Sequence, residues 1–287
     1  MINEVEMTEE VDELRRSILL LNEGTSEVDS LQPQEELPAD ADEVAKPAFL
    51  ASSSVLSRVA ADLADTIGYE TRTERLAHPL TSVQDVNDTT VPPWRVVAHL
   101  LLRTAHDVYH GSAFFITNTV LLTAGHNLFF HDIRRTPAIT IYPGRNGRSG
   151  YGAFTPKAVR VAAGWLQGDP DADFGIIAID QPLGAQLGKF GVRDLKPGDG
   201  NAVYVSGYPA DRQPRTQCAG AGTILGGTGR RISYSVETLD GQSGGPVALK
   251  GTLTAVGVHV ARPTGPAQAI RVTDVVKAEI TGWLQGL

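Results

Sequence analysis

Several features are scarce in this sequence of 287 residues, and each scarcity excludes a class of protein. The chain has one cysteine, Cys218, so it cannot form an internal disulfide. No apolar run approaches the ~20 residues that a membrane-spanning helix requires, so we expect no membrane segment. No basic stretch is interleaved with aromatic residues, which argues against a nucleic-acid partner. The first residues carry neither a basic stretch nor an apolar run, so no secretory signal is visible.

Charge is distributed unevenly along the chain. Residues 1–80 contain 18 Asp and Glu against 6 Lys and Arg, whereas the whole chain has a net charge of −8. Within this block, Thr25–Ala48 is poor in aromatic residues and rich in Glu, Asp and Pro, which is typical of a disordered linker. We therefore divide the chain into an acidic, partly disordered N-terminal segment, 1–81, and a folded domain, 82–287. The acidic segment is either a solvated tail or a pro-segment that masks a more positive site.

The folded domain has the pattern of a β protein. Short apolar runs are separated by Gly, Pro, Asn and Asp, which predicts β-strands. The runs include Ala113–Ile116, Ala138–Tyr142, Lys157–Val161, Gly175–Ile179, Ala202–Ser206, Arg231–Val236 and Leu253–Val260. One helix is predicted, over Thr273–Leu284, with Thr273 as its N-cap. The glycine-rich stretches 219–223 and 226–229 lack a following helix or a P-loop lysine, so we interpret them as β-turns and not as a nucleotide site.

Three motifs carry groups suited to acyl transfer. Gly241–Pro246 reads Gly-Gln-Ser-Gly-Gly-Pro and places Ser243 on a tight turn. Thr123-Ala124-Gly125-His126 follows an apolar run, and Asp173 lies two residues before Gly175 at the start of another. Acyl transfer uses a nucleophile, a base and donors for the oxyanion. Taken alone, Ser243 is an ordinary turn residue and His126 a core histidine, but their coincidence favours a hydrolase. Asp171 is a rival for the carboxylate.

The order His126, Asp173, Ser243 is that of chymotrypsin-type enzymes. With the surrounding motifs, the chain resembles the glutamyl endopeptidase (V8-like) group of chymotrypsin-fold serine proteases, bacterial enzymes that cleave after acidic residues. The likeness covers roughly residues 82–287 and includes Asn87-Asp88-Thr89-Thr90, Pro92-Pro93-Trp94-Arg95, Pro143-Gly144-Arg145-Asn146-Gly147, Ser206-Gly207-Tyr208-Pro209 and Gly257-Val258-His259. It implies an all-β fold of two packed antiparallel six-stranded β-barrels with a C-terminal helix and an active site between the barrels.

The resemblance also implies a role for each catalytic group. Ser243 would attack the scissile carbonyl, and His126 would accept its proton and pass it to the leaving amine. Asp173, favoured over Asp171, would hold the imidazole. The backbone N–H groups of Gly241 and Ser243 would form the oxyanion hole.

The substrate pocket follows from the same resemblance. His259 matches the specificity histidine that faces an acidic P1 side chain, and Thr238 matches the hydroxyl beside it; the alternatives are a structural histidine and a plain strand threonine. Arg262 stands where the family usually has a glycine, so it either adds positive charge or obstructs a subsite. Cleavage after Lys or Arg is the alternative specificity. It requires a pocket carboxylate, and Glu237 and Asp240 only flank the matching position, Thr238.

We therefore expect a monomeric serine endopeptidase that cleaves after Glu or Asp in protein or peptide substrates, with no metal or cofactor. The alternative is a peptide-binding regulatory module on a protease scaffold with little turnover. His106 and His110 have metal-ligand spacing only on a helix, and they lie between strand-like runs. The N-terminal segment is a possible intramolecular inhibitor of a zymogen. The family is mostly secreted, and this chain shows no signal peptide.

Besides Arg262, two further departures from the family are visible in the sequence. Gln242 precedes Ser243, so no Asp is present there to pair with a new N-terminal amine, which excludes trypsin-style activation. Asn127 follows His126, where many relatives have a disulfide cysteine.

Overall fold

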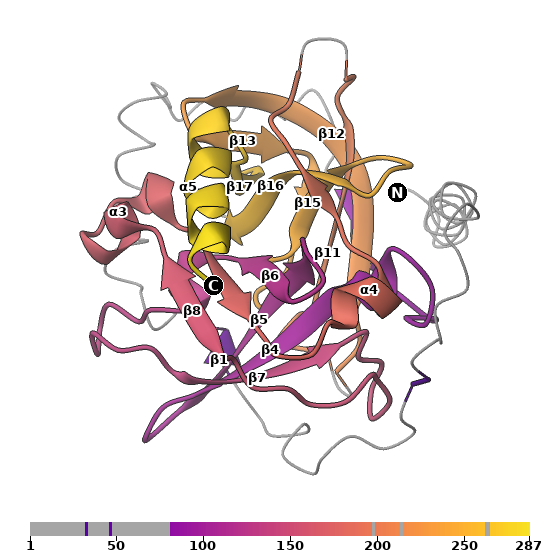
Figure 1. Ribbon diagram of the computed structural model, residues 1–287. Helices are drawn as coiled ribbons and strands as arrows, with labels where there is room; N and C mark the ends of the chain where they lie inside the picture. Colours follow the sequence, from indigo (N-terminus) through magenta and orange to yellow (C-terminus); the bar gives the residue numbers. More distant parts are fainter. Residues whose placement is uncertain (1–31, 34–45, 48–80, 197–198, 213–214, 262–264) are drawn as a thin grey trace.

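The computed structural model describes residues 32–33, 46–47, 81–196, 199–212, 215–261 and 265–287 (Figure 1). Most of the acidic segment and Arg262 lie outside the described residues. Two β-sheets make up most of the fold, with a C-terminal helix beside them (Figure 1). The all-β class and the two packed barrel-like sheets predicted from the sequence are confirmed.

The first sheet has the strand order β7-β4-β5-β6-β9-β8. Its members are β4 (Val97–Arg103), β5 (Val108–Phe115), β6 (Val120–Thr123), β7 (Ala138–Pro143), β8 (Ala158–Val161) and β9 (Gly175–Ala178). These strands are antiparallel, and a short strand from the N-terminal segment, β1 (Lys46–Pro47), pairs in parallel with β5. β6 covers β5 only from Ala113 onward, so the first half of β5 has an edge that β6 leaves open.

The second sheet has the order β10-β16-β15-β11-β12-β13-β17. Its members are β10 (Gly191–Val192), β11 (Ala202–Gly207), β12 (Cys218–Thr228), β13 (Arg231–Tyr234), β15 (Pro246–Leu249), β16 (Thr254–Ala261) and β17 (Ala267–Arg271). β3 (Gln84–Asp85) adds to β12, and β2 (Thr81–Ser82) pairs with β14 (Val236–Glu237). The sheet therefore has more strands than the six predicted, and β10 joins it in parallel.

The described helices are short except for the last. They are η3 (Trp94–Val96), η4 (Gly125–Asn127), α3 (Ala163–Leu166), η5 (Pro170–Ala172), α4 (Leu183–Leu187) and α5 (Asp274–Gln285). The Thr273 hydroxyl accepts a hydrogen bond from the Val276 N–H at 3.3 Å, as expected of an N-cap. Val276 and Ile280, four residues apart, bury one face of α5. The predicted C-terminal helix is confirmed.

One continuous hydrophobic core joins the two sheets. It includes Leu100, Phe114 and Ile177 of the first sheet together with Tyr204 and Val258 of the second. A separate cluster of buried apolar side chains lies on the second sheet and contains no residue of the first. Because the larger core crosses the border, the sheets pack as one unit and hold the loops at that border in fixed places.

The glycine-rich stretches are not the turns that we predicted. Residues 219–223 and most of 226–229 belong to β12, and only Gly229, with φ of +55°, lies in the turn that follows it. β12 is long because it pairs with β11 on one side and β13 on the other. Strand pairing has overridden the weak strand propensity of glycine here.

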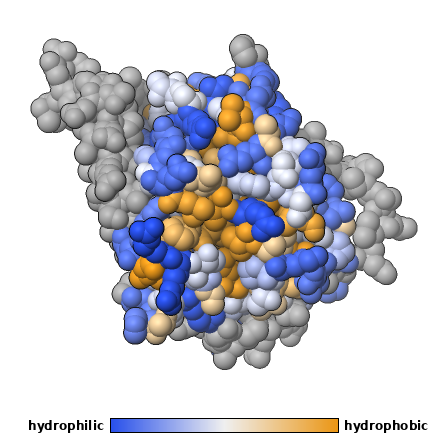
Figure 2. Space-filling model, turned by 60° about the vertical axis from the view of Figure 1, so that its left-hand side comes forward, coloured by the Kyte–Doolittle hydropathy of each residue, from blue (hydrophilic) through white to orange (hydrophobic). Residues whose placement is uncertain are grey.

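The surface mixes apolar and polar residues. In Figure 2, hydrophobic residues gather near the centre of the face and hydrophilic residues surround them. Among the described residues, large exposed hydrophobic side chains include Leu166 of α3 and Val275 of α5. None of the described helices is both long and apolar enough to span a bilayer.

Candidate active site

His126 and Asp173 form a buried pair at the edge of the first sheet. Strands β6 and β9 are neighbours, with Thr123 opposite Gly175, and this register brings together the segments that carry the two residues. The Nδ1 atom of His126 lies 2.7 Å from Oδ2 of Asp173, and the His126 backbone N–H donates to Oδ1 at 2.8 Å. Both side chains are fully buried. The carboxylate therefore fixes the position and the tautomer of the imidazole.

The rival carboxylate points elsewhere. Asp171 lies on η5, half of its side chain is exposed, and it accepts a hydrogen bond from Nε of Arg231 at 2.6 Å. The structure therefore pairs His126 with Asp173, the residue that the sequence favoured.

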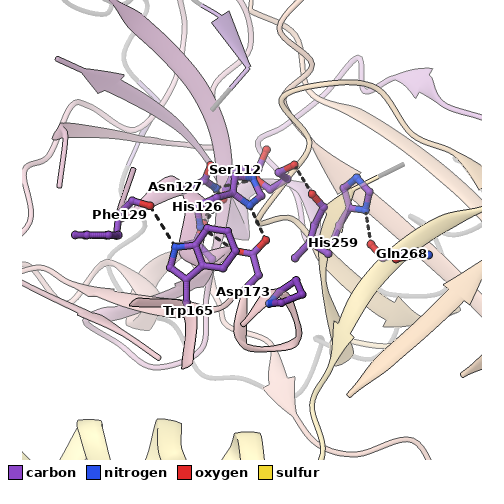
Figure 3. A network of polar contacts seen from close by, with 12 residues as sticks. Ser112, His126, Asn127, Phe129, Trp165, Asp173, His259 and Gln268 are labelled. Carbon is purple, nitrogen blue, oxygen red and sulfur yellow. Dashed lines mark hydrogen bonds and ion pairs between the residues drawn. The ribbon is translucent and has the colours of Figure 1, made fainter. Parts of the chain in front are cut away.

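An indole ring lies beside the His126–Asp173 pair. The ring of Trp165 is fully buried, with its centroid 6.2 Å from that of His126. Its Nε1–H donates to the Phe129 carbonyl at 3.2 Å, which fixes the ring (Figure 3). Apolar cover of this kind lowers the local dielectric and strengthens the hydrogen bonds of the pair.

The turn that carries Ser243 is tied to the first sheet. Ser243 O accepts from the Ser112 N–H at 2.8 Å and from Nδ2 of Asn127 at 2.9 Å. The Ser112 hydroxyl donates to Gly241 O at 3.0 Å. Gly241 and Gly244 have φ of +99° and +91°, and a Cβ on Gly244 would overlap the Ser112 carbonyl. This turn therefore requires glycine on both sides of the serine.

Several backbone N–H groups of this turn already donate hydrogen bonds to backbone carbonyls. Gln242 N donates to Leu239 O, Gly244 N to His259 O, and Gly245 N to Gln242 O. Within the described part of the chain, the N–H groups of Gly241 and Ser243 donate to no other backbone carbonyl. These are the two groups assigned to the oxyanion hole from the sequence.

Ser243 and His126 do not share a hydrogen bond. The Ser243 hydroxyl donates to the Val260 carbonyl at 3.0 Å, and Nε2 of His126 is buried without a hydrogen-bond partner among the described residues. A serine hydroxyl has one proton to donate, and rotation about its Cα–Cβ bond redirects it. In this structure no hydrogen bond therefore joins the Ser243 hydroxyl to the imidazole of His126.

His259 lies on β16 behind Ser243, and its ring is almost fully buried. Its Nδ1 lies 2.5 Å from the Tyr234 hydroxyl. The same atom lies 3.1 Å from Gln268 O (Figure 3). The pKa of His259 is lowered from 6.5 to about 4, mainly by burial and to a smaller extent by the nearby His126, while the Gln268 carbonyl opposes the shift. His259 is therefore neutral at neutral pH in this state of the protein.

Thr238 is buried near the start of the same turn. Its hydroxyl has no hydrogen-bond partner within the described residues, which is unusual for a buried polar atom. The next residue, Leu239, donates its N–H to Oε1 of Gln242 at 2.7 Å, so the side chain before Ser243 shapes the turn.

Several residues at this site were not singled out from the sequence. Ser112, Tyr234, Gln268 and Arg231 stand in no motif, and only strand register brings them to the site. Asn127 was noted only as a replacement for a cysteine. Its amide contacts Thr123, Ser112 and Ser243, which ties together segments of both sheets.

The two histidines four residues apart do not face each other. His106 is exposed between β4 and β5, whereas His110 is buried on β5 with its Nδ1 2.7 Å from Nε2 of His99. The described residues contain no group of three or more His, Cys, Asp or Glu placed to hold a metal ion.

Known proteins resemble this chain in sequence. The chain matches the trypsin-like peptidase domain family over residues 111–258. It is 30% identical over 165 residues to a glutamyl endopeptidase of Bacillus licheniformis. This alignment covers 56% of this chain and 51% of that protein. It is also 27% identical over 207 residues to a Bacillus subtilis protein named extracellular metalloprotease. This alignment covers 69% of this chain and 66% of that protein. The matches thus span about half and about two thirds of these relatives.

A solved structure shows the same fold. A Glu endopeptidase in complex with MPD aligns with a TM-score of 0.64 and 21% identity, over 74% of this chain and 99% of that one. The predicted resemblance to V8-like, chymotrypsin-fold proteases is confirmed.

Proposed function

Because the chain belongs to the trypsin-like peptidase family, we propose that it is a serine endopeptidase whose catalytic residues are Ser243, His126 and Asp173. The observation that carries the proposal is the fully buried His126–Asp173 pair: Nε2 of His126 has no hydrogen-bond partner among the described residues, and the next residue, Asn127, binds the Ser243 carbonyl. A base oriented by a carboxylate beside a serine on a glycine turn is the arrangement that acyl transfer needs.

The proposed reaction uses each group in turn. The Ser243 hydroxyl turns away from Val260 O and attacks the scissile carbonyl carbon, while its proton passes to Nε2 of His126. Asp173 stabilises the imidazolium, and the N–H groups of Gly241 and Ser243 hold the oxyanion. His126 then gives the proton to the leaving amine, which leaves an acyl-enzyme. Water, activated by His126, hydrolyses the ester in the same way.

We further propose that the enzyme prefers Glu, and secondarily Asp, at P1. A carboxylate that enters a desolvated pocket needs hydrogen-bond donors, or its burial costs several kcal/mol. The buried hydroxyl of Thr238 is without a partner among the described residues, and His259 lies near enough to His126 for their charges to interact. If the Tyr234 hydroxyl donates to Nδ1 of His259, the ring hydrogen of the neutral form sits on Nε2, where it donates to the substrate.

A P1 library tests this specificity on the parent and on His259→Ala. We expect the parent to prefer Glu, and His259→Ala to lose about 10²-fold in kcat/KM for Glu while Leu at P1 loses little, because only the carboxylate loses a donor. Thr238→Val should act in the same direction with a smaller loss. A parent that prefers Lys or Arg, or a uniform loss for every P1 residue, would contradict the Glu specificity and leave the catalytic assignment untouched.

One observation favours a second function, a peptide-binding module with little turnover. Ser243 donates to Val260 O and not to His126, so the nucleophile is not activated in this state. A fluorophosphonate probe separates the two functions, because only an activated serine reacts with it. Stoichiometric labelling that is lost in Ser243→Ala supports the peptidase, and absence of labelling supports the module.

The acidic segment, 1–81, is proposed to act as a pro-segment and intramolecular inhibitor of the domain 82–287. Its strand β1 pairs with Tyr109 and His110 on the open edge of β5, two residues before Ser112, which contacts Ser243. Glu70 and Glu74 lie upstream of the domain in the sequence, where an enzyme specific for Glu would cut itself. Mass spectrometry of the active protein should show an N-terminus after one of these residues. Full activity of an unprocessed chain, unchanged by truncation, would contradict the proposal.

A further inference from the structure

One buried arginine, Arg231, joins the second sheet to the turn η5 beside the site. Arg231, on β13, uses three nitrogens in three directions. Its Nε donates to Oδ1 of Asp171 at 2.6 Å, its Nη2 to Pro170 O at 2.6 Å, and its Nη1 to Oε1 of Gln268 at 3.1 Å. Only 9% of its side chain is exposed. A guanidinium placed in this way fixes its partners relative to one another.

On one side, Arg231 holds the turn that leads to the catalytic carboxylate. Pro170 and Asp171 belong to η5, which Asp169 caps by accepting the Asp171 N–H at 2.9 Å. Asp173 follows η5 directly and holds both the ring and the backbone of His126. A shift of this turn therefore moves the carboxylate on which the imidazole depends.

On the other side, Arg231 holds the strand that supports the pocket histidine. Gln268 lies on β17, next to β13, and its carbonyl lies 3.1 Å from Nδ1 of His259. That carbonyl raises the pKa of His259 against the effect of burial, so it stabilises the protonated ring that a bound carboxylate favours. Arg231 reaches the same residue through its side-chain oxygen.

We propose that Arg231 is a positioning residue that fixes where the Asp173–His126 pair lies relative to the His259 pocket. The inference rests on the proposed function and deepens it, since one side chain would control both turnover and P1 selectivity. Lysine keeps the positive charge but lacks the planar guanidinium with its donors in fixed directions, so it cannot hold Asp171, Pro170 and Gln268 at once.

The test uses Arg231→Gln, Arg231→Lys and Asp171→Asn in the full chain. Arg193→Gln is the matched control, because Arg193 also makes a two-point ion pair, with Asp199, that joins no part of the site. Active sites are counted with a fluorophosphonate probe, and kcat and KM are measured per site on paired peptides with Glu or Gln at P1. The ratio between these peptides reports the pocket and does not change when part of the protein is merely unfolded.

We expect Arg231→Gln to lower kcat by about 10- to 100-fold, as small misplacements of catalytic groups do, and to lower the Glu-to-Gln ratio by about 5-fold or more. Arg231→Lys should recover part of the kcat and little of the ratio, and Arg193→Gln should stay within about 2-fold of the parent. If Arg231→Gln does not fold, Asp171→Asn decides the question, because it removes the negative charge that Arg231 binds from a half-exposed side chain without opening the core; we expect about 3- to 10-fold lower kcat.

Two results would overturn the inference. In the first, the Arg231 and Asp171 variants match the parent in kcat per site and in the Glu-to-Gln ratio. In the second, kcat falls while the ratio stays constant, which would make Arg231 a support of the turn alone. A parent that cleaves neither peptide would instead contradict the proposed function.

Discussion

At the scale of single residues, Tyr234 bears on the proposed role of His259, because it would influence which neutral form of the ring faces a substrate carboxylate. The Nδ1 atom of the ring has two neighbours, the Tyr234 hydroxyl and the Gln268 carbonyl. A neutral ring that accepts from Tyr234 carries its hydrogen on Nε2, whereas one that donates to Gln268 leaves Nε2 as an acceptor. Only the first form offers a hydrogen bond to a carboxylate.

This choice makes a pH-dependent prediction for Tyr234→Phe. Without the hydroxyl, neutral His259 turns its hydrogen toward Gln268 O, so kcat/KM for Glu substrates should fall about 10-fold at pH 8. At pH 5.5 the loss should be smaller, because a bound carboxylate raises the pKa of His259 from its value of about 4 and so favours the protonated ring, which carries hydrogens on both nitrogens. Tyr204→Phe is the control, since this variant loses a hydrogen bond to Thr252 O in the turn between β15 and β16. An equal loss for Tyr234→Phe at both pH values would contradict the tautomer argument.

The catalytic residues could be predicted from the sequence because each stands in a local motif. The glycines of Gly241–Pro246 are enough to predict the tight turn that carries Ser243. The pairing of His126 with Asp173 was predicted from the order His, Asp, Ser along the sequence. Tyr234 and Arg231 could not be predicted in the same way. Their roles depend on the register of β13 against β17, which no local pattern encodes. The catalytic roles themselves stay predictions until they are tested.

At the scale of elements, the hydrophobic pattern predicted strands where both faces are buried. β9 is an example, because every residue of Gly175–Ala178 is buried and the sequence shows a continuous apolar run. It failed for β12, where glycines take strand conformation between two partners. Periodicity reports side chains, so a strand made largely of small residues leaves little signal.

The C-terminal helix gives a prediction at this scale. Thr273→Ala removes the hydroxyl that accepts the Val276 N–H, so the free energy of unfolding should fall by about 1 kcal/mol. Thr281→Ala is the control in the same helix, because the exposed Thr281 hydroxyl donates only to the Lys277 carbonyl, one turn earlier, and caps no helix end. Urea denaturation measures both variants in a Ser243→Ala background, which prevents self-digestion. Equal effects of the two changes would show that Thr273 does not cap α5.

At the scale of the whole molecule, buried histidines make stability depend on pH. Burial lowers the pKa of His110 to about 3, assisted by the charges of Arg215 and Arg145, and that of His99 also lies well below its usual value. Burial lowers the pKa of His259 to about 4. The unfolded chain binds protons on these residues near pH 6.5, whereas the folded chain does not, so acid favours unfolding.

We therefore expect the free energy of unfolding to be largest above pH 6.5 and to fall as the pH is lowered toward 4. Each such histidine contributes up to about 1.4 kcal/mol per pH unit in this window. His110→Gln should flatten the curve, and His106→Gln, at an exposed position, should leave it unchanged. Urea denaturation at pH 7, 6 and 5 checks this, and identical slopes for parent and His110→Gln would contradict it.

The central claim is that this molecule hydrolyses peptide bonds through Ser243, and its kcat tests that claim most directly. Ser243→Ala and His126→Ala should each keep the parental circular dichroism spectrum and lower kcat on a Glu peptide by at least about 10⁴-fold, since members of a triad act as a unit. Cleavage by folded Ser243→Ala at a rate near that of the parent would contradict the account.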